Sequence, residues 1–284
     1  MSTPLQIRPM DAADTGTAMD WAAREGWNPG LSDGPLFRAL DPAGFLVGTL
    51  AGDVVATLSV AAYDARFAFL GLYIVRPDLR GRGHGRALWA AGLARAGARI
   101  VGLDGVLARE GTYRRGGFAT AHRNIRFAGP AGQPRPTDPR VGPRDPVARD
   151  PDALVAFDAR HVPGRRPAFA RAWIKAPGHG VRVARVDGRI AGYGVVRPAR
   201  EGHRIGPLFA EREDLAEALF TALSATCAPG EPLALDAPEP NAAAARLAER
   251  HGLSPVFETA RMYRGPAPDL PLGQIYGLAS LEVG

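Results

Sequence analysis

The sequence predicts an α/β protein of the α+β type, built from two similar halves that each have a mixed central sheet flanked by helices. Its 284 residues are the length of two ordinary domains. The segment from Gly129 to Pro146 holds six Pro and three Gly and almost no apolar residues, so it predicts a linker. The two sides also match at a nearly constant offset. Leu50–Val55 resembles Val186–Ala191, and Arg115–Phe118 resembles Arg250–Leu253.

These observations divide the chain into three segments. We expect a first domain over residues 1–128, a linker over 129–146 and a second domain over 147–284. The tail from Pro266 to Gly284 is too apolar to be free in solvent, so we expect it to dock on the second domain as a strand.

The first half begins with a short strand and a helix that Asp11 starts as N-cap. Ala51-Gly52-Asp53 between two apolar runs is a hairpin signal. Phe67–Val75 is nearly continuous in apolar residues, which predicts a strand buried on both faces. Helical spacing of Leu88, Trp89 and Leu93 predicts the helix that follows. The expected strands are 5–10, 45–50, 54–62, 67–75, 100–103 and 118–127, and the helices are 12–25, 35–40, 85–96 and 108–115.

The second half repeats this outline. A hairpin from Val181 to Arg197 precedes a strand, a helix and a further strand. The remaining strands are expected at 204–209, 232–236 and 256–263, and the helices at 152–160, 168–174, 214–226 and 241–251.

Composition excludes several classes of protein. Hydrophobic residues make up 46% and charged residues 23%, which is typical of a globular protein. The start of the chain lacks a signal-peptide pattern, and no apolar run reaches the roughly 18 residues of a membrane span. We therefore expect a cytoplasmic protein without a membrane partner. The sequence indicates nothing about oligomeric state.

The net charge of +6 raises the question of nucleic-acid binding. Lys175 is the single Lys among 35 Lys and Arg, and the arginines are dispersed without basic runs or a known motif. We therefore expect no nucleic-acid partner. A modest positive charge also suits an anionic ligand such as a nucleotide-bearing cofactor.

Cysteine and histidine do not point to a metal site. Cys227 is the one cysteine and is interpreted as a packed thiol. The six histidines show no metal-ligand spacing, so no metal is expected.

The most informative segment follows the buried strand, where glycines alternate at 81, 83 and 85 before a helix begins. The first N–H groups of a helix are unpaired, and the helix dipole favours an anion there. Glycines let the backbone approach a pyrophosphate closely. Arg80, Arg82 and Arg86 add charge that can bind phosphate oxygens.

Two common phosphate loops do not match this segment. A P-loop needs G-x-x-x-x-G-K-[ST], and the chain has no such run. The dinucleotide fingerprint needs G-x-G-x-x-G, whereas the spacing here is G-x-G-x-G without a suitably placed acid.

The sequence resembles the GNAT superfamily of acyl-CoA N-acyltransferases. The family's pyrophosphate loop reads [QR]-x-x-G-x-[GA], which Arg80-Gly-Arg-Gly83-His-Gly85 matches. Tyr113-Arg-Arg-Gly-Gly117-Phe118 resembles the family's Y-x-x-x-G-F, and the order of elements follows the family over residues 5–127. The two-domain arrangement looks like a subgroup of tandem GNAT proteins.

The resemblance implies transfer of acetyl from acetyl-CoA to a primary amine of a small or amino-acid-like molecule, directly and without a metal. It makes Tyr113 the acid that protonates the departing thiolate. Backbone N–H groups around Tyr73 to Val75 would hold the oxyanion. The cofactor-contacting residues it implies are Tyr73, Ile74, Val75, Arg80, Gly81, Arg82, Gly83, His84, Gly85 and Arg86.

The general base and the acceptor site stay open at this point. Asp104 follows a strand near the expected acceptor position and is a candidate base, as are other carboxylates or a water chain. The candidate acceptor-side residues are Glu25, Trp27, Asn28, Asp33 and Tyr63.

The second half lacks the matching groups. At the same offset, Arg80, Gly83 and Gly85 align with Leu215, Ala218 and Phe220, and Tyr113 aligns with Ala248. The loop there carries Glu211, Glu213 and Asp214, which would repel a pyrophosphate. We therefore expect a degenerate GNAT-like domain that shapes the acceptor site.

Two other functions are compatible with these patterns. The first is an acyl-CoA-binding sensor or interaction module without turnover. The second is acetylation of protein lysines or N-termini, with the second domain as docking surface. Neither the acceptor nor the acyl chain length follows from the sequence.

Overall fold

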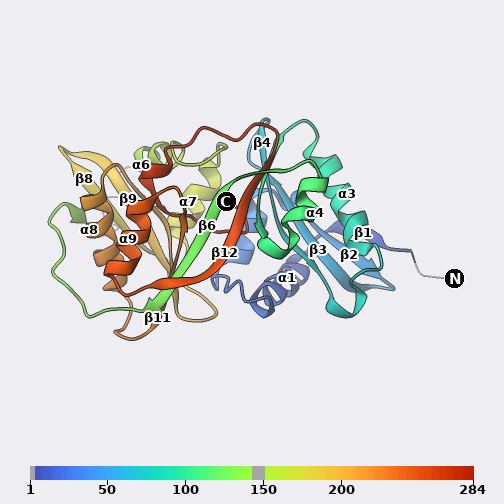
Figure 1. The fold of residues 1–284 in the computed structure, drawn as a ribbon, viewed down its shortest axis with the longest axis horizontal. Helices are drawn as coiled ribbons and strands as arrows, with labels where there is room; N and C mark the ends of the chain where they lie inside the picture. The colour runs from blue at the N-terminus through green and yellow to red at the C-terminus, as the bar shows by residue number, and fades with distance from the viewer. Residues whose placement is uncertain (1–3, 143–150) are drawn as a thin grey trace.

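The computed structural model describes residues 4–142 and 151–284. In these residues the strands form one 13-stranded mixed sheet with the order β1-β2-β3-β4-β5-β12-β6-β11-β10-β9-β8-β7, and β13 pairs with β10 beside this path. The sheet runs along the molecule, with the first half of the chain at one end and the second half at the other (Figure 1). This mixed α/β arrangement confirms the predicted fold class.

The elements of the first half agree closely with the expected ones. The Asp11 side chain accepts a hydrogen bond from the Asp14 N–H, and the Asp14 side chain accepts one from the Asp11 N–H, so a capping box starts α1. The elements are β1 (Gln6–Pro9), α1 (Ala12–Arg24), α2 (Asp33–Leu40), β2 (Phe45–Leu50), β3 (Asp53–Ala62), β4 (Phe67–Val75), α3 (His84–Ala96), β5 (Ile100–Val106), α4 (Glu110–Arg115) and β6 (Ala119–Pro130).

The second half repeats the pattern. The β8–β9 turn places Asp187 and Gly188 at positive φ, as Ala51 and Gly52 are in the β2–β3 turn. The elements are β7 (Val141–Gly142), α6 (Pro151–Asp158), α7 (Pro167–Lys175), β8 (Gly180–Val186), β9 (Arg189–Pro198), β10 (His203–Ala210), α8 (Glu213–Ser224), β11 (Pro232–Pro238), α9 (Ala242–Arg250), β12 (Ser254–Arg264) and β13 (Ile275–Gly277).

The two halves exchange their long final strands. β12 comes from the second half, yet it pairs with β5 of the first, from Thr259 opposite Val106 to Arg264 opposite Val101. β6 comes from the first half and pairs with β11 of the second. The two exchanged strands also pair with each other and cross the centre of the molecule (Figure 1). The halves therefore share one hydrogen-bond ladder instead of forming separate sheets.

This exchange affects the segment that the composition assigns to a linker. β6 continues through Gly129 and Pro130, which still pair with β11, and Val141–Gly142 pairs with β8. Residues 131–140 contain no helix or strand. Residues 143–146 of the expected linker lie outside the described residues.

Helices cover both faces of the sheet. α3 and α4 pack on one face of the first half, around Leu58, Leu88 and Met262. α8 and α9 cover the corresponding strands of the second half. On the other side, α1, α2, α6 and α7 share one apolar cluster that spans both halves, where Phe37 stacks on Trp173 at 6.1 Å.

Buried ion pairs cross the same interface. Asp33 at the start of α2 accepts hydrogen bonds from Arg197 of β9 at 2.9 and 3.2 Å, and both side chains are at most 1% exposed. Burial raises the pKa of Asp33, but the charge and hydrogen bonds of Arg197 outweigh burial and hold that pKa below its usual value. A second pair between the halves, Arg200 with Asp20, is about half exposed.

The chain ends by crossing back over both halves. Ile275–Gly277 forms β13 on β10, and the Leu278 N–H then donates to the Asp236 carbonyl of β11 at 2.8 Å. The segment then reaches β4. A Cβ atom built on Gly71 would lie 2.0 Å from the Glu282 carbonyl oxygen, so only glycine fits beside this tail.

We expect Asp33→Asn to reduce the free energy of unfolding by about 3–5 kcal/mol, because it leaves the Arg197 charge buried without its partner. Asp20→Asn is the matched control at the exposed pair and should cost less than about 1 kcal/mol. Urea unfolding followed by circular dichroism measures both. Equal losses for the two variants would contradict the role given to the buried pair.

Candidate active site

The site begins where two parallel strands separate. β4 and β5 pair from Phe67 opposite Ile100 to Leu70 opposite Leu103, and both strands continue beyond that point without pairing. β4 has one extra residue relative to β3 at the point of separation, which is a β-bulge. Leu72 lies there at φ 48°, and its carbonyl accepts a hydrogen bond from Thr57 Oγ1 at 2.7 Å. The bulge turns the end of β4 away from β5.

The separation leaves backbone groups of β4 without a strand partner. The Arg76 N–H donates to the Val55 carbonyl of β3 at 2.9 Å. Because N–H groups alternate along a strand, the Val75 N–H points to the opposite side, toward the gap beside β5. This N–H is available to an oxygen atom that enters the gap.

The glycine-rich loop follows directly. Gly81 and Gly83 have φ of 80° and 88°, which a residue with a side chain adopts only with strain. Gly83 is the N-cap of α3 and provides no side chain to cap the first N–H groups of the helix. A Cβ atom on Gly85 would lie 2.6 Å from Tyr73 Oη, so the helix start packs against the end of β4.

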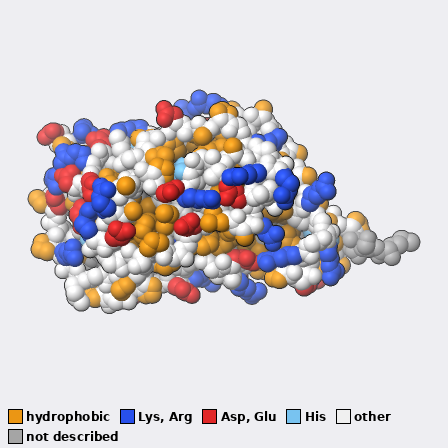
Figure 2. Space-filling view, in the orientation of Figure 1, with side chains coloured by type: hydrophobic (Ala, Val, Ile, Leu, Met, Phe, Trp, Pro, Cys, Tyr) orange, Lys and Arg blue, Asp and Glu red, His pale blue; other side chains and the backbone are white. Residues whose placement is uncertain are grey.

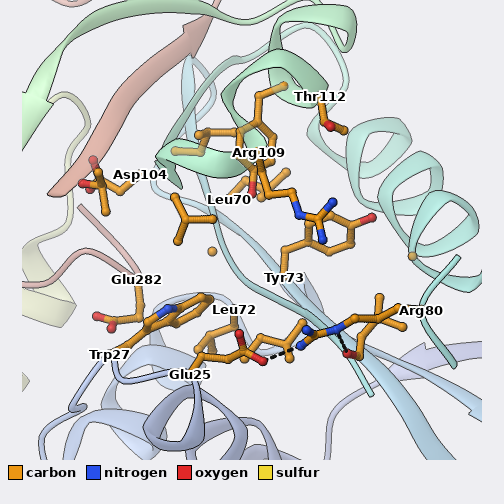
Figure 3. A pocket seen from close by; sticks show the side chains of 18 of the residues that line it. Glu25, Trp27, Leu70, Leu72, Tyr73, Arg80, Asp104, Arg109, Thr112 and Glu282 are labelled. Carbon is orange, nitrogen blue, oxygen red and sulfur yellow. Dashed lines mark hydrogen bonds and ion pairs between the residues drawn. The ribbon is translucent and has the colours of Figure 1, made fainter. Parts of the chain in front are cut away.

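These elements enclose a cavity of about 390 Å³. Its walls are the end of β4, the glycine-rich loop, the start of α3, the end of β5 and α4. The second half of the chain completes it, with Phe257 and Thr259 of β12 and Leu281 and Glu282 of the tail. In Figure 3, Asp104, Trp27 and Glu282 lie at one end, away from Arg80.

The structure brings most of the predicted cofactor residues together. Of the ten, Arg82 alone does not line the cavity; those that do are Tyr73, Ile74, Val75, Arg80, Gly81, Gly83, His84, Gly85 and Arg86. The side chains of Arg82 and Arg86 are exposed and form no hydrogen bond or ion pair with another described residue. They therefore stay available for an anionic ligand.

Arg80 is held by protein groups. Its Nε donates to the Val75 carbonyl at 3.0 Å, and its Nη2 pairs with Glu25 from the end of α1 (Figure 3). Arg80 thus ties the end of β4 to α1 and positions the start of the glycine-rich loop.

Tyr113 lies on α4 and lines the cavity. Its ring stacks on Trp89 of α3 at 5.6 Å and packs over Gly105, where a Cβ atom would lie 2.5 Å from the ring. Burial, with a smaller contribution from nearby Tyr73, raises the pKa of Tyr113 to about 12, while Arg109 opposes this shift. Tyr113 is therefore protonated throughout the neutral range.

Asp104 also lines the cavity, but its carboxylate is already bound. Arg261 of β12 donates to it at 2.7 and 2.9 Å, and Asn124 of β6 donates at 2.7 Å. Burial raises the pKa of Asp104, against the opposing charge and hydrogen bonds of Arg261. Protonating this carboxylate would break a buried ion pair, which weighs against Asp104 as the base although burial raises its pKa.

Two of the five predicted acceptor-side residues line the cavity, Glu25 and Trp27. The other three lie outside it. Asn28 bonds its side chain to the backbone of Glu201, and Asp33 is bound to Arg197 between the halves. Tyr63 is partly buried and packs against Phe67 and the Arg166 guanidinium. All three stabilise the packing of the first half on the second.

Several residues that line the cavity were not predicted. Arg109 points toward Tyr73 (Figure 3) and follows β5 in a short turn, and Thr112 precedes Tyr113. Four more reach the site only through the strand exchange and the tail: Phe257, Thr259, Leu281 and Glu282. The apolar character of the tail is the signal that could have indicated its approach to a site.

The equivalent place in the second half is filled. β10 has a bulge between Ile205 and Leu208, which matches the one in β4. β13 pairs with β10 there, and a Cβ atom on Gly277 would lie 2.5 Å from Leu235 of β11. The N-terminus of α8 carries Glu213 and Asp214 in place of glycines.

One cluster of possible metal ligands occurs among the described residues. One ligand atom from each of His203, Cys227 and Glu231 lies within 4.8 Å of the others. Glu231 also accepts a hydrogen bond from the Ala228 N–H at 2.9 Å, and burial raises the pKa of the Cys227 thiol to about 11. A protonated, buried thiol agrees with the packed role expected for Cys227.

The surface agrees with the dispersed arginines of the sequence. On the face shown in Figure 2, basic and acidic side chains alternate and form no continuous basic patch. No helix of the described ranges is long and apolar enough to span a membrane.

Comparison with known proteins identifies the class. A model of the acetyltransferase (GNAT) family matches residues 15–118, and a model of an acetyltransferase (GNAT) domain matches residues 154–277. The chain belongs to the GNAT acetyltransferase superfamily and is an acyltransferase with two GNAT domains in tandem. The fold and family predictions are therefore confirmed.

Among its relatives is the holothin acyltransferase of Pseudoalteromonas sp. (strain SANK 73390), which is 33% identical over 266 residues, or 93% of this chain and 90% of the relative. A putative acetyltransferase from Pyrococcus horikoshii has a similar fold, with a TM-score of 0.83 and 20% identity over 99% of this chain and 96% of that one. A tandem GNAT protein from the clavulanic acid biosynthesis pathway also has a similar fold, with a TM-score of 0.62 and 18% identity. The match covers 93% of this chain and 100% of that one.

We expect Gly83→Val to weaken acetyl-CoA binding at least about tenfold, because the side chain strains the loop and enters the cavity. Gly188→Val is the matched control, since Gly188 has φ 79° in a turn with open space around it. Both variants should lose similar stability. Calorimetry that finds unchanged affinity for Gly83→Val, or equal weakening in the control, would contradict the assignment of the loop.

Proposed function

We propose that the protein is an N-acetyltransferase that moves acetyl from acetyl-CoA to a primary amine of a small molecule by direct transfer. The observation that carries this proposal is the gap between β4 and β5, which the glycine-rich loop, the Val75 N–H and Tyr113 all border. A GNAT acyltransferase uses an acyl-CoA donor. A pyrophosphate would lie at the loop and the thioester in the gap.

The loop would hold the donor mainly through its backbone. Gly83 leaves the first N–H groups of α3 uncapped, and these groups and the helix dipole attract the pyrophosphate. Arg82 and Arg86 would add charged contacts, while Arg80 keeps the loop in place. The pantetheine arm would then enter between β4 and β5.

The Val75 N–H would stabilise the oxyanion that forms as the amine attacks the thioester carbonyl. Tyr113 would donate its proton to the departing sulfur. A thiol has a pKa of about 8.5 and Tyr113 one of about 12. Moving the proton fully from Tyr113 to the sulfur therefore costs about 5 kcal/mol, unless Tyr113 receives another proton at the same time. The attacking nitrogen becomes positively charged and can replace it, so the two proton movements would occur together.

The acceptor would be a small molecule. The holothin acyltransferase supports this, since it covers nearly the whole chain and its name gives a small-molecule substrate. The end of the cavity away from Arg80 also supports a small acceptor, because residues of the second half border this end. Such a site favours a compact acceptor.

The second half would not bind a donor of its own. β13 fills its gap, and Glu213 and Asp214 stand at the N-terminus of α8, where a pyrophosphate would have to lie. Its role would be to contribute strand β12 and the tail to the site of the first half.

We expect Tyr113→Phe to lower kcat by about 100-fold or more, because it removes the proton donor to the thiolate, with little change in the Kd of acetyl-CoA. Tyr276→Phe is the control, since Tyr276 is a buried tyrosine of β13 in the second half. Thiol release with an amine panel measures both. Undiminished turnover by Tyr113→Phe would show that Tyr113 is not the acid. If kcat fell with Tyr73→Phe instead, Tyr73 would be the acid.

A further inference from the structure

Each carboxylate that lines the cavity has an arginine beside it. Glu25 pairs with Arg80, and Asp104 is bound at two positions by Arg261. Glu282 is 2% exposed, and its Oε1 lies 4.0 Å from Arg204 Nη1. His84, also in the lining, belongs to the first turn of α3 on the glycine-rich loop, at the end occupied by Arg80.

Glu282 balances a buried charge. Arg126 and Arg204 both bind Asp236, and Arg197 binds Asp33, so the arginines exceed these two acids by one positive charge. Glu282 supplies the missing negative charge. The cluster thus holds three arginines and three acids, all at least about 95% buried: Arg126, Arg197, Arg204, Asp33, Asp236 and Glu282.

Each of the three carboxylates that line the cavity therefore already neutralises an arginine and is not a free base for a strongly basic amine, and His84 lies at the other end of the cavity. A lysine-like amine is neutral in only about 1 molecule in 2,500 at pH 7 and needs a base to become a nucleophile. A weakly basic amine is already neutral and needs hydrogen bonds that orient its lone pair. The charge arrangement around the cavity suits a weakly basic amine.

The cavity has polar atoms for this purpose. Thr259 Oγ1 and Glu282 Oε1 are buried and have no hydrogen-bond partner among the described residues, although both residues line the cavity. Buried polar atoms are normally satisfied, so two unsatisfied ones in the wall of one cavity indicate the position of a ligand's polar group. Both come from the second half of the chain.

The neighbouring surface is apolar. Trp27, Phe257 and Leu281 line the cavity together with these two residues. Trp27 and Glu282 lie on the same side in Figure 3, away from Arg80. Aromatic and branched side chains favour a flat, apolar molecular body.

We propose that the acceptor is a weakly basic primary amine on a compact apolar ring, and that Glu282 Oε1 and Thr259 Oγ1 accept its N–H hydrogen bonds. This rests on the proposed acetyltransferase function. The neutral nitrogen forms a bond to the thioester carbon as the C–S bond breaks. The sulfur takes a proton from Tyr113, and the nitrogen gives one back to Tyr113, so an amide and a free thiol result.

The first test compares aniline with benzylamine, which have similar bodies but differ in basicity. We expect kcat/KM for aniline to exceed that for benzylamine at least tenfold at pH 7 and to be nearly constant from pH 6 to 9. Preference for benzylamine at pH 7 would overturn the inference and leave the acetyltransferase function intact. If acetyl-CoA binds but neither amine reacts, the acceptor class is wrong, and if acetyl-CoA does not bind, the proposed function fails.

The second test addresses the two residues. Glu282→Gln and Thr259→Val should each raise the KM for aniline at least fivefold, with the Kd of acetyl-CoA changed less than twofold. Glu258→Gln is the matched control, because Glu258 is exposed on β12 beside Thr259. Thr259→Val changes no charge, so it still tests the inference if Glu282→Gln unfolds. Unchanged KM for Thr259→Val, or parallel losses in amine and acetyl-CoA affinity, would overturn the assignment.

Discussion

The hydrogen-bond ladder between β5 and β12 is the constraint on which the site depends. It brings a strand from the second half against the first, and with it Thr259 and Phe257 into the wall of the cavity. The same strand supplies Arg261, which fixes Asp104 at the end of β5. Because β6 makes the reciprocal exchange with β11, neither half can complete its sheet alone. The buried pair of Asp33 with Arg197 stabilises the same interface by joining helix α2 of the first half to strand β9 of the second.

The repeated fold explains why β4 and β10 carry matching bulges, although the gap beside β4 is open as the large cavity and the gap beside β10 is filled by β13. Gly71 and Gly206 occupy equivalent positions in β4 and β10, and a carbonyl of the tail lies against each, from Glu282 and from Leu278. At β10 the tail adds a strand and fills the gap beside β11. At β4 it passes the bulge and leaves the gap toward β5 as a cavity. One segment thus accounts for the difference between the halves, together with the acids at the start of α8.

The sequence predicted what depends on local patterns. The helix start at Asp11, the turns at Gly52 and Gly188 and the continuous apolar run of β4 each need only neighbouring residues, and the structure has each of them. The glycine spacing located the loop for the same reason. Contacts between segments that are distant in the sequence could not be predicted from it. Nothing in the pattern of residues 254–264 distinguishes a strand that stays in its own half from one that crosses. Asp33 was expected on the acceptor side because no residue near it in sequence indicates its partner Arg197.

Hydrogen exchange measured by mass spectrometry, with and without acetyl-CoA, tests the central claim that both halves build a single donor site in the first half. Slower exchange is expected in residues 71–87 and in the tail at 280–283, with no change in residues 206–216 around β10 and the start of α8. Slowing in 206–216 equal to that in 71–87 would mean that the second half binds donor itself. No slowing in 71–87 would place the donor elsewhere and contradict the account.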